Sequence, residues 1–367
     1  MNRIKKSLFF KDDKDVYDAL VQKTPSKKIL LNHLKNKGLL LSEAEDKNEI
    51  AEYISPFFTG FFDQKFIVDA NNDTKSNKKF TSVSLDVDYD YSEFKKICDS
   101  IKKQEDGLII QKHGDNIKIT QSYTKPDYSK NVLSQNTPRM VEIEIEKNSD
   151  GTVLVRSNND EQATNIVSKI KKCVKEKHAE EYSEFNISFS ALTSPIARTE
   201  FFSNLIKSIK GYRLTNVKMV AVSKESRSMV SDEDADTKLG YIRKAVLNGG
   251  SVNSSEEFLR LVESGFYVTK IEWTIESDMH SGDKIDLYAE FKNIEDCSDF
   301  IYSLQRVYKR KDNGDFLSNG SSPSDIENSV MLPKIELAAK ISYESILSEY
   351  GELNVTAEIT NENNKMV

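Results

Sequence analysis

The sequence predicts an α+β fold, in which a small N-terminal helical domain precedes antiparallel sheets flanked by amphipathic helices. Two observations lead to this expectation. Apolar and polar residues alternate in several short segments, as at Val141, Ile143 and Ile145, which indicates strands with one buried face. Elsewhere, apolar residues recur every three or four positions, as in amphipathic helices. The continuous Val/Ile/Leu strands of a doubly wound parallel fold are absent.

Residues 1–68 are expected to form the helical domain. Segment 24–26 supplies a cap for a first helix, and Gly38 would end this helix in a left-handed conformation that glycine adopts cheaply. A second helix is expected to end near Pro56, before a run of phenylalanines. Residues 69–79 show no hydrophobic period, so we predict a linker there.

Residues 80–180 are expected to form a first α+β domain. An alternating strand and an amphipathic helix open it between residues 83 and 101. Hairpins are predicted at 108–122 and at 141–155, the second from an Asp-Gly turn flanked by alternation. A helix around 166–174 closes the domain.

Residues 181–311 are expected to form a second α+β domain. Its predicted elements are a strand at 185–190, a helix that begins at Pro195, a strand at 217–221, a polar loop at 223–238, a hairpin at 271–291 and a helix at 300–308. The recurring order of strands beside a helix predicts a split β-α-β, ferredoxin-like character. Beyond it we expect a loop at 312–330, a C-terminal helix at 331–351 and a polar tail at 352–367.

The composition excludes several classes of protein. The 367 residues are 38% hydrophobic and 30% charged with both signs, which suits a packed core rather than a disordered chain. No apolar run reaches the ~18 residues that span a bilayer, so no membrane partner is expected. Because the net charge is −7, any contact with nucleic acid must come from a local patch. The short apolar run near the N-terminus does not suit a signal peptide, which predicts a cytoplasmic location.

No cofactor or metal is expected. Cys98, Cys173 and Cys297 lie far apart, and neither a glycine-rich phosphate loop nor a nucleophile elbow nor a His-Glu-x-x-His motif occurs. Carboxylates stand at every second position over Asp86–Asp90 and over Glu142–Glu146. They could hold a divalent cation, but we expect solvated outer faces of strands. The sequence therefore favours a protein that is not an enzyme.

Residues 27–56 contain a spaced pattern of apolar residues, a glycine, and a lysine and a glutamate at the expected start of the second helix. Its members, in order, are Leu34, Gly38, Leu39, Lys47, Glu49 and Ile50. The pattern resembles a SAP-type helix–loop–helix, a small module that binds DNA in many proteins. The resemblance implies that the two leucines pack between short helices and that Lys47 can reach a phosphate. A purely structural helical hairpin is the alternative, because positive and negative charges balance over 27–66.

Basic residues also cluster outside this module. If the helices expected to carry them pack side by side, they form a basic stripe that attracts phosphates. The alternative is that they lie on solvated helix faces. The expected nucleic-acid-binding residues are Lys27, Lys28, Lys35, Lys37, Lys47, Lys169, Lys172, Lys175, Lys207, Lys210, Arg213, Arg306, Lys309 and Arg310.

Three functional hypotheses follow. The first is a non-enzymatic intracellular accessory or sensor protein that contacts nucleic acid within a complex, for example in bacterial genome maintenance or antiviral defence against phage. The second is a scaffold whose partner, another protein or a second copy of the chain, covers Phe57, Phe58, Phe61 and Phe62. The third is a metal-dependent nuclease. The third hypothesis depends on a pattern that resembles the restriction-type nuclease core, with Asp283 or Asp286 ahead of Glu290 and Lys292. The resemblance implies that the carboxylates bind a metal and that the lysine steadies the attacking water.

Overall fold

The computed structural model describes residues 12–363, with gaps at 23, 59, 73–77, 128–132, 134, 149, 179–181, 225–243 and 281. The chain forms two compact units. The first unit comprises Met1–Ser76, Glu105–Ile109 and Thr120–Val141, and the second unit comprises Asn77–Gln104, Ile110–Ile119 and Glu142–Val367. Most of the predicted polar loop 223–238 lies outside the described residues.

The N-terminal part of the first unit is helical, as the sequence predicts. Its helices are α1 (Asp13–Leu20), α2 (Lys27–Asn36), α3 (Lys47–Ile54), the 3-10 helix η1 (Ser55–Phe57) and α4 (Phe61–Asn72). Ser26 and Asp46 cap α2 and α3, and Gly38 takes a left-handed conformation with φ of 82°. The helices enclose a core that includes Leu34 and Phe58. Helix α4 extends into the predicted linker 69–79, because apolar residues continue past residue 66.

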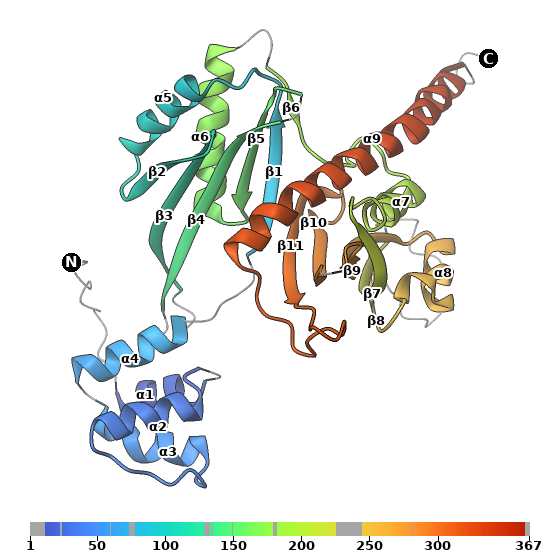
Figure 1. The fold of residues 1–367 in the computed structure, drawn as a ribbon. Coiled ribbons are helices and arrows are strands. Elements are labelled where there is room, and N and C mark those ends of the chain that lie inside the picture. The colour runs from blue at the N-terminus through green and yellow to red at the C-terminus, as the bar shows by residue number, and fades with distance from the viewer. Residues whose placement is uncertain are drawn as a thin grey trace, which may run out of the picture. The chain divides into compact units, whose positions relative to one another are not determined.

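The described strands form one antiparallel sheet. They are β1 (Phe80–Leu85), β2 (Leu108–His113), β3 (Asn116–Pro126), β4 (Asn136–Lys147), β5 (Val153–Asn158), β6 (Glu184–Phe185), β7 (Tyr212–Ser223), β8 (Lys244–Asn248), β9 (Tyr267–Ser277), β10 (Lys284–Asn293) and β11 (Ser298–Tyr308). Their order is β2-β3-β4-β5-β1-β11-β10-β9-β7-β8, with β6 paired to β1 (Figure 1). The predicted α+β class is confirmed.

Strand β1 joins strands from both predicted α+β domains. It pairs with β5 on one side and with β11 on the other. The ranges 80–180 and 181–311 therefore contribute strands to a single sheet, which continues across the boundary expected at residue 180.

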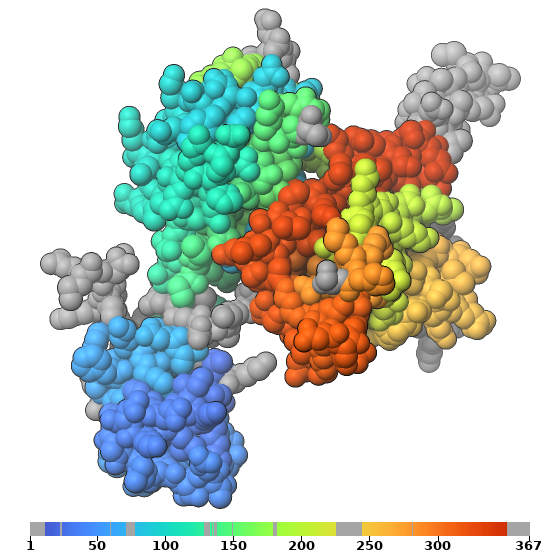
Figure 2. Space-filling view, in the orientation of Figure 1, coloured from blue at the N-terminus to red at the C-terminus, as the bar shows by residue number. Residues whose placement is uncertain are grey.

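Helices cover the sheet in two groups. They are α5 (Tyr91–Lys102), α6 (Glu161–Lys177), α7 (Pro195–Leu205), η3 (Val252–Ser254), α8 (Glu256–Glu263) and α9 (Asp325–Asn363). Helices α5 and α6 pack together, with α6 against β5, whereas α7 and α9 pack together and against β9 and β11. Figure 2 shows α9 at the surface of the second unit, beside α7. An aromatic core with Phe201, Phe291 and Phe300 lies beneath them, with ring centroids 5.5 Å apart.

Several predicted elements differ from the structure. Of the strand predicted at 185–190, only residue 185 lies in a strand, β6. Residues 300–308 form strand β11 rather than a helix, because both sides of this strand are buried and the apolar residues show no clear alternation. The C-terminal helix starts at Asp325, not near Pro333, which lies inside it. Ser324 and Glu327 explain the earlier start, since they form the reciprocal hydrogen bonds of a capping box. Helix α9 also continues past Gly351, where a polar tail was expected.

Candidate nucleic-acid interface

Strands β7–β11 bury one side in the core and carry polar side chains on the other. Helices α7 and α9 contact the core side, where Ile275, Leu287 and Phe300 lie. Directly paired residues of antiparallel strands project to the same side, so the register identifies the residues of the opposite side. We call this opposite side the polar face. It includes Arg213, Asn216, Met219, Ala221, Lys270, Glu272, Thr274, Glu276, Lys284, Asp286, Tyr288, Glu290, Ile301, Ser303, Arg306 and Tyr308, with Lys79, Lys218 and Arg310, whose side chains contact them.

Cations outnumber carboxylates on the polar face, although the chain as a whole has a net charge of −7. The cations are Lys79, Arg213, Lys218, Lys270, Lys284, Arg306 and Arg310, and the carboxylates are Glu272, Glu276, Asp286 and Glu290. The structure thus concentrates positive charge on one side of a sheet whose strands come from different parts of the chain.

Ion pairs neutralise part of this charge. Glu276 lies 3.0 Å from Arg213 and 2.7 Å from Arg310, and although burial raises the pKa of Glu276, the two arginines bring it below its ordinary value. Lys79 lies 2.8 Å from Glu290.

Lys218 similarly lies 2.5 Å from Asp286. Among the described residues, Lys270, Lys284 and Arg306 then have no carboxylate within ion-pair distance.

Lysines cover the two tyrosines of the polar face. The amino groups of Lys79 and Lys270 lie 4.4 Å and 5.0 Å from the ring centroid of Tyr288. Those of Lys218 and Lys284 lie 5.6 Å and 4.9 Å from that of Tyr308. Such cation–π contacts hold the amino groups at the surface. Burial, together with a hydrogen bond to Glu290, raises the pKa of Tyr288, so its hydroxyl stays protonated.

A pocket of about 250 Å³ indents the polar face. It is lined by Lys218, Glu272, Trp273, Asp286, Leu287, Gln305, Arg306 and Tyr308. Asp286 is buried there and accepts hydrogen bonds from Lys218 at 2.5 Å, from Thr274 at 2.7 Å and from Tyr308 at 2.8 Å. All of these contacts fix the Asp286 carboxylate in one position. We call this hollow the polar-face pocket.

Two β-bulges meet at the polar-face pocket. On β7, Val217 pairs with Trp273 and Met219 with Glu272, so Lys218 is an extra residue between them. On β11, Gln305 is the extra residue, between the partners of Leu287 and Asp286. A bulge bends its strand and re-aims the side chain of the extra residue. Both extra residues line the polar-face pocket.

The structure brings together only part of the predicted basic set. Arg213, Arg306 and Arg310 lie on the polar face. Lys309, which follows β11, binds Asp283 at 2.7 Å and Glu327 at 2.6 Å. The remaining predicted residues of the second unit lie on α6 (Lys169, Lys172 and Lys175) or directly after α7 (Lys207 and Lys210).

Several predicted basic residues of the first unit already have partners. Lys37 binds Asp63 at 2.6 Å, Lys27 donates to the carbonyl of Glu43 at 2.5 Å, and Lys47 donates to the carbonyl of Gln22. Burial lowers the pKa of Lys47. Lys28 and Lys35 lie exposed on α2. The helix–loop–helix of α2 and α3 is present, but its relation to SAP modules stays a prediction.

Sequence analysis placed Lys218 in a basic cluster with Arg213 but missed Lys79, Lys270 and Lys284. For Lys270 and Lys284 the signal was present in the alternation of β9 and β10, which we interpreted only as strand polarity.

The predicted nuclease residues do not share one site. Asp286 and Glu290 stand four positions apart on β10, which corresponds to about 13 Å along a strand. Each carboxylate binds a lysine, and Asp283 binds Lys309. Lys292 is exposed. Within the part of the chain that the structure describes, no group of three or more His, Cys, Asp or Glu side chains could hold a metal ion.

The predicted partner interface divides between core and surface. Phe57, Phe61 and Phe62 are 63%, 57% and 79% exposed, whereas Phe58 is 1% exposed and belongs to the core of the first unit. Phe58 is needed there because its ring packs near His33 and Phe66. The exposed members remain available to a partner.

A second polar site lies around Arg156 on β5, where three carboxylates share one guanidinium. The Arg156 guanidinium lies 3.0 Å from Glu144, 2.6 Å from Glu146 and 2.5 Å from Glu336 of α9. The predicted row Glu142–Glu146 is therefore only partly a solvated face.

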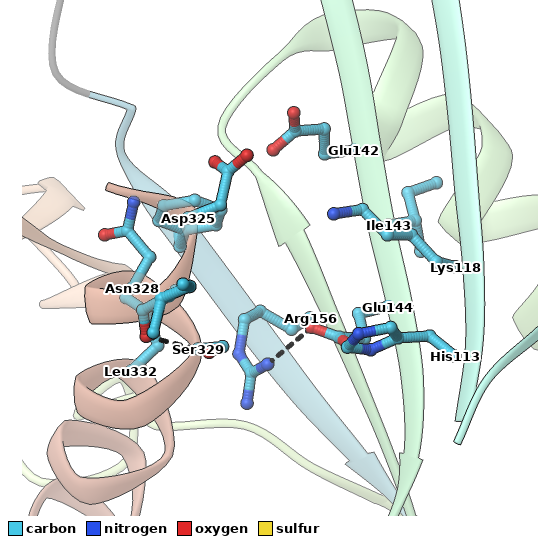
Figure 3. A pocket seen from close by; sticks show the side chains of 12 residues that line it. His113, Lys118, Glu142, Ile143, Glu144, Arg156, Asp325, Asn328, Ser329 and Leu332 are labelled. Carbon is cyan, nitrogen blue, oxygen red and sulfur yellow. Dashed lines mark hydrogen bonds and ion pairs between the residues drawn. The ribbon is translucent and has the colours of Figure 1, made fainter. Parts of the chain in front are cut away.

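Burial and the neighbouring Glu146 raise the pKa of Glu144. Figure 3 shows the adjoining pocket of about 170 Å³, with His113, Lys118 and Glu144 on one side and Asp325 and Asn328 of α9 on the other. The Arg156 guanidinium thus joins Glu336 of α9 to Glu144 and Glu146 of β4.

No described helix combines the length and the apolar character that a membrane span requires. In comparisons with known proteins, no family model matches the chain and no curated protein matches it.

Proposed function

We propose that this protein binds nucleic acid through the polar face and acts as a non-enzymatic subunit of a larger assembly. The observation that carries the proposal is the excess of cations on one sheet face of an acidic chain. Lysines and arginines that neutralise phosphates release counterions, which drives the association. Three of the basic residues expected from the sequence, Arg213, Arg306 and Arg310, belong to this face.

The polar face offers a phosphate backbone two kinds of cation, those with a carboxylate partner and those without one. Lys270, Lys284 and Arg306 lack carboxylate partners among the described residues, so a phosphate does not have to displace an ion pair to reach them. The arginines bound to Glu276 are held in place by it and can still donate through their remaining N–H groups.

Binding of a labelled oligonucleotide to the full chain tests this proposal. We expect affinity at low salt that falls as salt is added, and loss of binding in the double variant Lys270→Glu/Lys284→Glu. The matched control is Lys96→Glu, a charge reversal at an exposed position of α5. Absence of binding at low salt, or equal binding by the double variant and the control, would refute the proposal.

A second candidate function is a protein-interaction scaffold, which the exposed aromatic residues of the first unit favour. Tyr53 and Phe57 contact each other, as do Phe61 and Phe62, and all four are more than half exposed. Exposed aromatic side chains of this size are typical of protein interfaces. Both functions are compatible, since they use different units of the chain.

A further inference from the structure

The polar-face pocket differs in charge from its surroundings. The cations Lys218 and Arg306 and the carboxylates Glu272 and Asp286 line it, so their formal charges cancel. A phosphate placed inside would approach both carboxylates, which disfavours an anion there. Lys270 and Lys284 lie outside the pocket on the same face and lack this compensation. The polar face thus combines a neutral hollow with a cationic rim.

The size and the chemistry of the polar-face pocket suit a flat, neutral heterocycle. A cavity of about 150 Å³ accommodates benzene, and this pocket measures about 250 Å³. Arg306 lines the pocket and is also exposed, so its several N–H donors can serve a base inside and a phosphate outside. Glu272 supplies acceptors. The amide of Gln305 already donates to the Ser303 hydroxyl at 2.7 Å, so Gln305 shapes the wall of the pocket. Bulges place Lys218 and Gln305 at this point of the sheet, and bulges are common beside functional sites.

We propose that the polar-face pocket holds one unpaired nucleobase while the surrounding lysines contact phosphates, so that the preferred ligand is single-stranded. This inference rests on the proposed function and names its ligand class. The tyrosines of the polar face do not replace the pocket, because lysines lie over the rings of Tyr288 and Tyr308 and leave little room for base stacking. In a duplex the base edges are paired, and a base must be flipped out before it can enter a pocket.

Three labelled ligands of equal length test the inference on the full chain at one salt concentration. They are a single strand, the same strand without its bases, and a duplex. We expect the single strand to bind about tenfold more tightly than the abasic strand, the effect of one or two hydrogen bonds. It should also bind more tightly than the duplex, although the duplex has the higher charge density.

Variants test whether the preference for bases arises in the polar-face pocket. Gln305→Tyr keeps the charge of the face and places a larger side chain in the wall of the pocket. It should therefore exclude the base, weaken binding of the single strand about tenfold and leave binding of the abasic strand unchanged. The matched control is Gln104→Tyr, at an exposed glutamine after α5. Equal, salt-sensitive binding of all three ligands would overturn the pocket assignment and leave the proposed function standing. Absence of salt-sensitive binding to all three ligands would overturn both the pocket assignment and the proposed function. The comparison of the three ligands uses the unmodified protein, so it does not depend on whether a variant folds.

Discussion

The salt dependence of binding can be worked out from the ion pairs of the polar face. Lys270, Lys284 and Arg306 have no carboxylate partner among the described residues, so each can neutralise a phosphate. Each neutralised phosphate contributes about 0.7 to the slope of log affinity against log salt for a single strand, which gives a slope of about −2. Raising salt from about 50 to about 200 mM should then weaken binding about 20-fold, or about 1.7 kcal/mol.

Variants on both sides of the charge balance test this slope. Replacing Lys270, Lys284 or Arg306 with alanine should reduce the slope by about 0.7 each. Glu276→Gln should steepen it by about 1.4, because it releases both Arg213 and Arg310. Fluorescence anisotropy at five or more salt concentrations measures the slope, and Lys96→Ala on α5 serves as the control. A slope near zero, or one that these variants leave unchanged, would refute the assignment of phosphate contacts to this face.

Further predictions concern stability. Arg156→Ala should cost about 3–5 kcal/mol in urea unfolding, because it leaves buried carboxylates without their counter-ion. Although burial raises the pKa of Asp63, its lysine and histidine partners hold it below the ordinary value, so Asp63 stabilises the fold above about pH 4. That contribution is lost as pH falls through the lowered pKa, and Asp63→Asn should flatten the acid limb of a thermal-unfolding series. Phe58→Ala should lower the unfolding free energy by about 3–5 kcal/mol, whereas Phe62→Ser should change it by at most about 0.5 kcal/mol. Under the scaffold hypothesis, Phe62→Ser should also abolish any self-association seen in sedimentation.

Local patterns predicted the elements whose burial has a clear period. The hairpins at 108–122 and 141–155 are present because β3 and β4 alternate in burial and both turns contain glycine. The pair α2 and α3 is present because Ser26 and Asp46 supply caps. Strand β11 was misread because Ile301 and Ser303 are buried as deeply as the residues of its core side. Burial on both sides depends on tertiary structure, which a local pattern does not contain.

The candidate interface could not be predicted as a whole, because it depends on register. Lys270 and Glu290 are neighbours only through the pairing of β9 with β10, and Lys79 reaches Glu290 from before β1. The sequence directed attention to lysines on helices, whereas Lys270, Lys284 and Arg306, which have no carboxylate partner among the described residues, lie on strands. The positions of Lys218 and Gln305 at bulges leave no trace in the alternation of apolar residues.

The place of β1 has a consequence for biosynthesis. Strand β1 can pair with β5 soon after both leave the ribosome, but Phe80 meets Tyr302 only once β11 has been translated. In the interval, β6 can pair with Ser84 and Leu85, but the part of this edge near Phe80 presents bare amide and carbonyl groups. Such groups can template pairing with neighbouring nascent chains. Translation of the segment between β5 and β11 is therefore the stage at which we expect the polypeptide to aggregate most readily and to benefit most from a chaperone.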